Sequence, residues 1–399
     1  MERDWANLES LALDIIISKL IEPIDHIWFG SVCKNWHSIA KLNHLNNYKF
    51  RNNILPMLMI PSKKNPRKRS PRKRSLFSIS ANRVYEFQLT VFSNKRVCGS
   101  THGWIGTVDQ NNVITLVNPF KDVAPIILPR IDVYDSYKYY EFDVRKVTLS
   151  VDPITNPNDY VVAAIYTNRG CLAFMKAGQE FWTYMDDIDN PRHTGFIDVA
   201  FYKDLVYAVS CRNEIVSFDL CYSTCPYRFE ERIPNFVRQR DEDEDEDESY
   251  FPLAYLVTSL EGDLWMVRRF VDTVYPCVGG SENNGTQSFQ VFKLELDCTG
   301  EKLINMIKLE TLGDNVLFLG GSDSTSISAS YFSCYVQKNS IYYTDNYIDD
   351  TPVRYPQVPY DMGIYNVKDG SFGIHCPFKP YFKGLAPPVW VLPPFQWDC

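Results

Sequence analysis

The fold is indicated most clearly by the segment Phe201-Tyr202-Lys203-Asp204-Leu205-Val206-Tyr207-Ala208-Val209. Its residues predict a strand, a tight polar turn and a second strand. Runs rich in β-branched and aromatic residues, separated by turn residues, are typical of antiparallel sheets. The same order of turn, aromatic residue and amphipathic strand returns around 259–267, around 336–343 and, earlier in the chain, around 102–108. Repetition of this kind predicts a mainly β fold built from repeated sheets, a β-propeller.

The repeats divide into five four-stranded units and a remainder. The units fall at about 96–129, 144–187, 196–233, 251–310 and 315–377. The remaining strands, at 57–61, 76–80, 84–91 and 389–392, lie at both ends of the domain and together form a further blade. Closure by strands from both ends hides sheet edges that would otherwise pair with other chains. We therefore predict six blades, the last closed by N-terminal and C-terminal strands, although the weak repeats also allow five or seven.

A small helical module precedes the sheets. Its first predicted helix, at 8–21, is apolar nearly all round, which is typical of a helix covered on more than one side. Pro23 is expected to end that helix, and Asp25 to cap a second one at 27–32, before a third at 33–42. A unit of about 40 residues is marginal as an independent fold. Its apolar surface is therefore expected to be covered, either by the downstream domain or by a partner protein.

The segments Trp5-x-x-Leu8, Ser18-Lys19-Leu20 and Val32-Cys33-Lys34-Asn35-Trp36 resemble the F-box. The resemblance implies that this module grips the Skp-type linker of an SCF ubiquitin ligase. The residues that it assigns to linker binding are Trp5, Leu8, Leu13, Ile16, Leu20, Pro23, Val32, Cys33 and Trp36. One departure is Glu9, where F-boxes usually carry proline at the start of the first helix; an acidic residue also favours a helix N-terminus.

The larger part of the chain resembles the plant-specific KIB-type β-propeller, which commonly follows an F-box. The resemblance rests on 199–209, on the turn Asn118-Pro119-Phe120, and on the segments 341–345 and 363–367. It implies an F-box-like module at 1–48, a linker with the first strands at 49–80, and a propeller at 81–395.

Composition limits the other possibilities. The net charge of −8 gives no general attraction to nucleic acid or to an anionic membrane. No apolar run approaches the roughly 20 residues that span a bilayer, and the charged N-terminus is unlike a signal peptide. The eleven cysteines form no CxxC pair, so reduced and mostly buried thiols are expected, with no metal site. A role in an SCF complex requires that the protein act in the nucleus, the cytoplasm or both.

Two charged runs interrupt the chain, and both are expected to be solvated loops because like charges repel. The basic run consists of Lys63, Lys64, Arg67, Lys68, Arg69, Arg72, Lys73 and Arg74 in a loop at 63–74. It is interpreted either as a nuclear localisation signal or as a plain hairpin; it lacks the aromatic residues that stack bases, so nucleic acid is not expected as a partner. The acidic run, 241–248, lacks the glycine of a calcium loop.

No residue lies in a recognisable catalytic context, so we predict no catalytic residues, no cofactor and no enzymatic activity. Gly320-Gly321-Ser322 is interpreted as a turn rather than a phosphate cradle. Three hypotheses remain: an SCF substrate-recognition subunit that binds linker, cullin and an unknown protein substrate; a propeller interaction protein with a degenerate F-box, acting outside an SCF complex; and a propeller enzyme or glycan binder that uses carboxylates such as Asp186 and Asp187.

Overall fold

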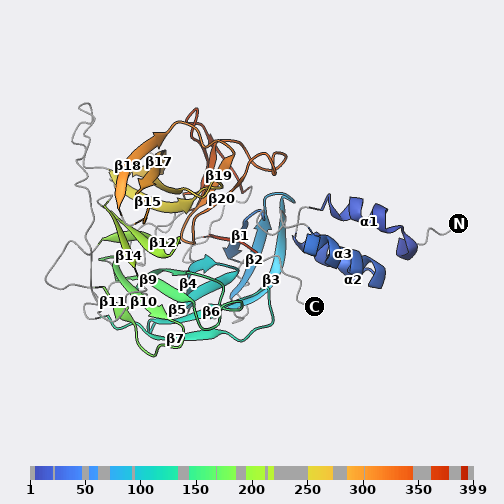
Figure 1. The fold of residues 1–399 in the computed structure, drawn as a ribbon, viewed down its shortest axis with the longest axis horizontal. Helices are drawn as coiled ribbons and strands as arrows, with labels where there is room; N and C mark the ends of the chain where they lie inside the picture. Colours follow the sequence, from blue (N-terminus) through green and yellow to red (C-terminus); the bar gives the residue numbers. More distant parts are fainter. Residues whose placement is uncertain are drawn as a thin grey trace, which may run out of the picture.

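Six sheets surround a common axis in the computed structural model, and a small group of helices lies beside them (Figure 1). The structure describes residues 5–20, 23–46, 54–61, 72–91, 95–133, 143–167, 169–185, 195–211, 214–219, 250–272, 285–300, 302–344, 361–376 and 388–393. Within these ranges, no helix has the length and apolarity needed to cross a membrane.

The helical module contains one short 3₁₀-helix and three α-helices: η1 (Trp5–Asn7), α1 (Ser10–Ile17), α2 (Pro23–Ser31) and α3 (Lys34–Asn46). The predicted boundaries were wrong in two places. α1 ends at Ile17, well before residue 21. Pro23 begins the second helix instead of ending the first, because the first turn of a helix does not need the N–H that proline lacks. Asp25 accordingly lies within the first turn of α2 and is not its cap.

The prediction of a blade closed by both ends of the domain is confirmed. Its strands, in spatial order, are β24 (Val389–Val391), β1 (Met57–Pro61), β2 (Arg72–Ser78) and β3 (Arg83–Val91). β24 pairs antiparallel with β1, Leu58 opposite Trp390. We call this sheet the composite blade. The C-terminal strand thus completes a sheet begun at the N-terminal side, and the ring is closed by ordinary strand pairing.

Five further sheets complete the ring, and we number these blades 1 to 5 in chain order. Blade 1 contains β4 (Lys95–Thr101), β5 (Trp104–Asp109), β6 (Val113–Val117) and β7 (Ile126–Arg130); blade 2 contains β8 (Val144–Leu149), β9 (Val161–Tyr166), β10 (Cys171–Lys176) and β11 (Thr183–Tyr184); blade 3 contains β12 (Phe196–Tyr202), β13 (Leu205–Ser210) and β14 (Ile215–Asp219). Blade 4 contains β15 (Tyr250–Thr258), β16 (Leu264–Asp272), β17 (Thr286–Leu296) and β18 (Leu303–Leu309); blade 5 contains β19 (Asn315–Leu319), β20 (Thr325–Ser328), β21 (Ser340–Tyr343), β22 (Gly363–Asn366) and β23 (Phe372–Gly373). The six-bladed prediction is confirmed.

Two blades differ from the predicted four-stranded plan. Blade 3 has three strands within the described part of the chain. Blade 5 has five, in the order β20-β19-β21-β22-β23, and β19 runs parallel to β21. The difference arises because the chain turns back after β19 and adds β20 at one edge of the sheet before it crosses to β21.

The basic run was predicted to be a loop through Arg74, and this was wrong at its C-terminal end. β2 begins at Arg72, and Arg74 is buried, opposite Pro61 of β1. Antiparallel pairing of β2 with β1 therefore continues into the charged run. Residues 62–71 and the whole acidic run, 241–248, lie outside the described residues.

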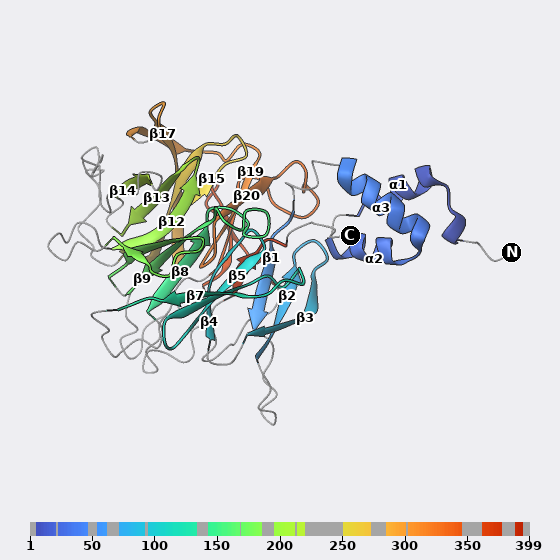
Figure 2. The same cartoon turned by 60° about the horizontal axis from the view of Figure 1, so that its bottom comes forward.

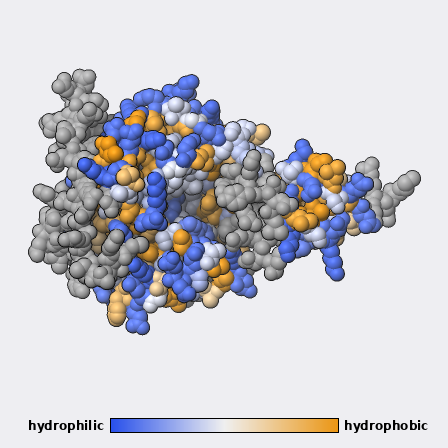
Figure 3. Space-filling model, viewed as in Figure 1, coloured by the Kyte–Doolittle hydropathy of each residue, from blue (hydrophilic) through white to orange (hydrophobic). Residues whose placement is uncertain are grey.

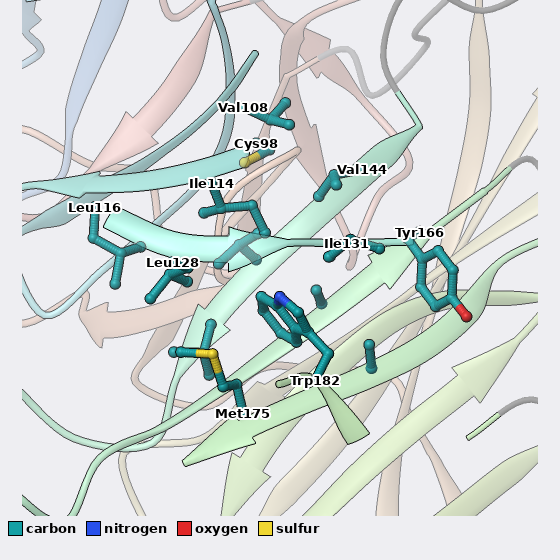
Figure 4. Close-up of a cluster of buried hydrophobic side chains, with 14 of the residues drawn as sticks. Cys98, Val108, Ile114, Leu116, Leu128, Ile131, Val144, Tyr166, Met175 and Trp182 are labelled. Carbon is teal, nitrogen blue, oxygen red and sulfur yellow. The ribbon is translucent and has the colours of Figure 1, made fainter. Parts of the chain in front are cut away.

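Apolar side chains fill the spaces between neighbouring blades. In the largest of these clusters, Cys98 and Ile114 of blade 1 face Val144, Met175 and Trp182 around blade 2 (Figure 4). The expectation that most cysteines are buried was wrong for the described residues, because three of the seven described cysteines are buried and three are exposed. All seven described cysteines are free thiols, so in this part of the chain the packing of sheet faces holds adjacent blades.

Polar contacts join the blades near the axis. Lys146 of β8 pairs with Asp198 of β12, whose other oxygen accepts the Leu256 amide of β15 at 2.7 Å. Asp323, in the segment between β19 and β20, accepts the Thr148 hydroxyl of β8 at 2.6 Å. Burial disfavours the charge of Lys146, but Asp198 and Asp323 outweigh it and hold the pKa of Lys146 above its usual value. Strands from blades 2, 3 and 4 are thus tied to blade 5 by buried charge.

Candidate partner-binding surface of the helical module

The helical module has a small apolar core of its own. Five side chains are buried in it: Leu13, Ile17, Phe29, Ile39 and Ala40. Leu8, Ile16, Leu20 and Trp36 pack against this cluster while keeping part of their surface exposed. The rings of Phe29 and Trp36 lie with their centroids 4.5 Å apart, which joins α2 to α3. One face of each helix is therefore used internally.

Residues 33–36 fix the segment that leads into α1. The indole N–H of Trp36 donates to the Trp5 carbonyl at 3.0 Å, and the Asn35 amide donates to the Ala6 and Leu8 carbonyls at 3.4 Å each. These bonds satisfy backbone carbonyls of an irregular segment that has few partners within its own backbone. The motif around Trp36 therefore holds η1 in place against the start of α3.

Large apolar side chains cover much of the outside of the module. Those most exposed are Leu11 (70%), Trp5 (55%), Val32 (54%), Leu42 (53%), Ile15 (52%) and Trp28 (49%). Leu11 and Ile15 are one turn apart on α1, on the side opposite the buried Leu13 and Ile17. Figure 3 shows the resulting apolar patches on the module. We call these six residues the module surface. Exposed apolar patches of this kind are typical of interaction sites.

The predicted linker-binding residues fall into different environments. Trp5 and Val32 belong to the module surface, whereas Leu13 is fully buried and holds the helices together. Leu8, Ile16, Leu20 and Trp36 are intermediate, as is Cys33; the side chain of Pro23 lies outside the described set. Sequence analysis missed Leu11, Ile15, Trp28 and Leu42. A helical wheel places the first two opposite positions 13 and 17, but both sides of this helix are apolar, so packing alone decides which side is exposed.

Glu9, the departure from the family pattern, occupies the N-cap position of α1. Its backbone is extended, with φ −60° and ψ 144°, and its carbonyl accepts the first helical hydrogen bond from Leu13 at 3.1 Å. These angles lie within the range that proline adopts. Its carboxylate makes no capping hydrogen bond, so the backbone alone shapes the start of the helix. The local fold expected of a proline at this position is thus present with glutamate.

The ionisable side chains His26 and Asp25 contribute to the packing of the module rather than to a reactive site. Nε2 of the buried His26 lies 2.8 Å from the Leu20 carbonyl, which joins α2 to the chain after α1. Burial holds the pKa of His26 below its usual value, and burial likewise raises the pKa of the neighbouring Asp25. Over the described part of the chain, no group of three His, Cys, Asp or Glu residues is arranged to hold a metal ion.

Among the described residues, an aromatic contact joins the module to the propeller. The rings of Trp28 in α2 and Tyr85 in β3 are 6.5 Å apart, and the Arg83 guanidinium lies 5.6 Å from the centre of the Tyr85 ring. Figure 2 shows the helices beside β2 and β3 of the composite blade. The module is therefore seated at one edge of the ring, with much of its apolar surface turned to solvent.

Comparison with known proteins places both parts of the chain. A family model described as the KIB1-4 beta-propeller matches residues 76–366. The F-box protein SKIP23 of Arabidopsis thaliana is 22% identical in an alignment 424 positions long. The alignment covers 97% of this chain and 95% of SKIP23. A second Arabidopsis thaliana relative, whose name also includes the F-box, is 22% identical over 269 residues, 64% of each chain.

Solved structures share only a weak structural similarity with this chain. The N-terminal domain of Nup159 covers 69% of this chain and 65% of its own, with 10% identity and a TM-score of 0.32. YCF48 bound to D1 peptide covers 63% of this chain and 67% of its own, with 11% identity and a TM-score of 0.31. These values are too low to support any argument about fold or function.

Proposed function

Because the chain belongs to the KIB1-4 β-propeller family and its relatives are F-box proteins, we propose that it is the substrate-recognition subunit of an SCF-type ubiquitin ligase. In this role the helical module binds the Skp-type linker, which connects it to the cullin, and the propeller binds the protein to be ubiquitinated. The subunit itself catalyses nothing. It raises the effective concentration of target lysines near the conjugating enzyme.

The module surface is the observation that carries this proposal. Six large apolar side chains, each about half exposed or more, cover a unit of three short helices. Such exposure costs solubility unless a partner covers it. The propeller covers little of it, since the module is joined to the ring through Trp28 and Tyr85 at one edge. A protein partner for the remaining surface is the simplest explanation.

A second candidate is a propeller interaction protein that acts outside an SCF complex. The glutamate at position 9 favours it, because the family usually has proline there. The extended backbone of Glu9 weakens that objection, since the start of α1 keeps a proline-like conformation. Binding to the linker separates the two candidates directly.

The test is a binding measurement between the purified full chain and an Arabidopsis thaliana Skp-type linker. The double variant Trp5→Ser with Val32→Ser removes two exposed anchors without touching the buried core of the module, and so does Leu11→Ser with Ile15→Ser. Each pair is expected to weaken binding at least about tenfold, as loss of interface anchors does. Ile127→Ser, on the propeller strand β7 and 71% exposed, is the matched control and should leave affinity unchanged.

The proposal fails if the wild-type chain does not bind the linker, or if both double variants bind as well as the wild type. Helical circular dichroism of each variant shows whether the module remains folded. Substitution of Leu8 or Trp36 would not give this information, because both pack against the core of the module.

We also propose that the basic run, Lys63 to Lys73, directs the protein to the nucleus. The support is its charge density, which suits import receptors. Replacing Arg67, Lys68 and Arg69 by alanine is expected to shift a fluorescent fusion toward the cytoplasm. Arg74 is left unchanged because it is buried in β2. An unchanged distribution would refute nuclear import through this run.

A further inference from the structure

The connections between strands emerge at two opposite ends of the propeller. In an antiparallel blade, the link from the first to the second strand and the link from the third to the fourth lie at the same end. The described links of this kind are 79–82, 102–103, 118–125, 150–160, 177–182, 203–204, 259–263 and 297–302 without residue 301. We call this the hairpin end. The segments 329–339 and 367–371 of blade 5 join it, because Asn315, opposite Ser328, contacts the 259–263 link, and the Val367 amide donates to the Asn339 carbonyl at 2.8 Å.

Hydrogen bonds between blades show that these links share one end of the ring. The Trp104 indole of blade 1 donates to Asp152 of blade 2 at 2.8 Å. The Tyr202 hydroxyl of blade 3 donates to the Gly262 carbonyl of blade 4 at 2.7 Å. The Leu260 amide of blade 4 then donates to Asn315 of blade 5 at 2.8 Å. The hairpin end thus runs from blade 1 to blade 2 and from blade 3 through blade 4 to blade 5.

This end combines apolar side chains with an excess of negative charge. Val123, Phe181, Leu260 and Tyr331 are exposed on it, Phe181 to 79%. Its described links contain nine Asp or Glu residues and five Lys residues, with no arginine, and Lys293 of β17 pairs with one of the acids, Asp263, at 2.7 Å. Single exposed apolar residues are ordinary, but four of them within an acidic surface match a partner that is both apolar and basic.

The seam between blades 4 and 5 shows this combination at short range. The Asn315 amide donates to both Glu261 oxygens, at 3.0 and 3.2 Å, and Asp314 accepts the Ser330 amide at 2.7 Å. Partial burial opposes the charge of each carboxyl, but hydrogen bonds outweigh it and hold the pKa of both below the usual values: Glu261 accepts from Asn315, and Asp314 accepts from the Ser328 hydroxyl and from Ser330. Two fixed negative charges therefore lie beside the exposed Leu260 and Tyr331.

The helical module is attached at this same end. Residues 54–56 lead into the start of β1, and the 79–82 link leads into β3, where Tyr85 contacts Trp28 of the module. A protein held on the hairpin end is consequently on the side of the ring from which the module extends. This is the side on which a ligase bound to the module would have to reach its target.

We propose that the hairpin end is the target-docking surface and that it takes a basic polypeptide segment whose apolar side chains pack at the Leu260–Tyr331 seam. This inference rests on the proposed function, since it names the chemistry of the target that the propeller recognises. Lysine and arginine side chains of the segment pair with the acidic links, and its apolar anchors cover the exposed side chains between them.

The test begins with selection of short random peptides displayed on phage against the immobilised full-length protein. Enriched peptides are expected to be rich in Lys or Arg with interspersed Leu, Phe or Met. One enriched peptide, synthesised with a fluorophore, is then titrated with wild-type protein by anisotropy. Its affinity is expected to fall with added salt, as exposed charge pairs require, and at least about tenfold in Leu260→Ser with Tyr331→Ser.

A second variant tests charge without disturbing the hydrogen bonds of the seam. Glu180→Lys with Asp204→Lys reverses two exposed charges and is expected to weaken the same peptide by a similar factor. Ile304→Ser, 64% exposed on the outer strand β18, is the matched control and should bind like the wild type. No enrichment, enrichment of acidic peptides, or wild-type affinity in both double variants would each overturn the inference.

The linker measurement described above is independent of these titrations. A protein that binds the linker but selects no basic peptide would retain the proposed function and lose this inference. A protein that selects such peptides at the hairpin end but does not bind the linker would keep the docking surface and lose the ligase role.

Discussion

The helical module leaves six large apolar side chains strongly exposed within residues 5–46, whereas the described part of the much longer propeller exposes ten. The difference arises because a sheet of the ring has more neighbouring elements than a helix of the module. Each sheet of the ring packs against a sheet on either side, so both faces of a strand are buried, as in β13. The helices of the module pack only against one another, which leaves one side of each uncovered. Substitutions are therefore expected to cost stability in the ring and binding on the module.

The largest loss of stability is expected at the axis of the ring. Lys146→Met leaves Asp198 buried without its cation, and breaking a buried ion pair in this way costs about 3–5 kcal/mol. Urea unfolding followed by tryptophan fluorescence measures the change. Lys308→Met, at an exposed position of β18, is the matched control and should stay within about 0.5 kcal/mol of wild type. Equal midpoints for the two variants would show that the axial charges do not hold the blades together.

A smaller loss is expected where two inner strands touch. A Cβ at Gly99 of β4 would lie 2.0 Å from the Val147 carbonyl oxygen of β8, and backbone at that position cannot easily move aside. Gly99→Ala should therefore destabilise the protein by about 1–3 kcal/mol. Gly106→Ala, in the adjacent strand, meets its nearest atoms at 3.5 Å and should have little effect or stabilise slightly. If the two variants unfold alike, the close approach of blades 1 and 2 is not needed for stability.

The closing contact of the ring should depend on pH. Nε2 of His375 lies 3.0 Å from the Tyr343 carbonyl, its ring centre is 5.1 Å from that of Trp390 in β24, and burial lowers its pKa to about 4. Between about pH 6.5 and 4 the unfolded chain binds the proton that the folded chain refuses, so stability falls as pH falls. The loss from this group is about 1 kcal/mol between pH 6.5 and 5.5.

His375→Gln isolates that contribution. The variant should unfold at a denaturant midpoint that changes less between pH 6.5 and 5.5 than the wild-type midpoint does. His102→Gln, at an exposed turn, should keep the wild-type slope. A slope unchanged in His375→Gln would mean that this imidazole titrates similarly in the folded and unfolded chains.

The ring was more predictable from sequence than the module surface, for a physical reason. Strand alternation and turn residues recur in every blade, so even weak repeats predicted six blades and placed 57–61 and 389–392 in one blade; the structure adds that these two strands pair directly. The glycines after Leu319 predicted a turn there, but no local pattern encodes that the returning strand β20 pairs at the edge of blade 5 and leaves β19 parallel to β21. On the module, the pattern predicted an over-apolar helix, but Leu13 and Leu11 look alike in sequence and only packing decides which one is buried.

The smallest change in stability is expected at Glu9. A substitution there tests whether the stability of the module can be changed separately from its binding. The φ of −60° suits proline, and among the described residues no acceptor is found for the Glu9 N–H that proline would remove. Glu9→Pro should therefore stabilise the module by about 0.4–1 kcal/mol, by restricting the unfolded chain. Hydrogen exchange of amides in α1 and α3 would register this as slower exchange, with propeller amides unchanged.

Asp14→Pro, in the interior of α1, is the matched control and should speed exchange, because it breaks a helical hydrogen bond. If Glu9→Pro also accelerates exchange, the start of α1 is not proline-like, and the glutamate marks a real departure from the F-box. If it slows exchange and leaves linker affinity unchanged, residue 9 shapes the stability of the module while the module surface determines its binding.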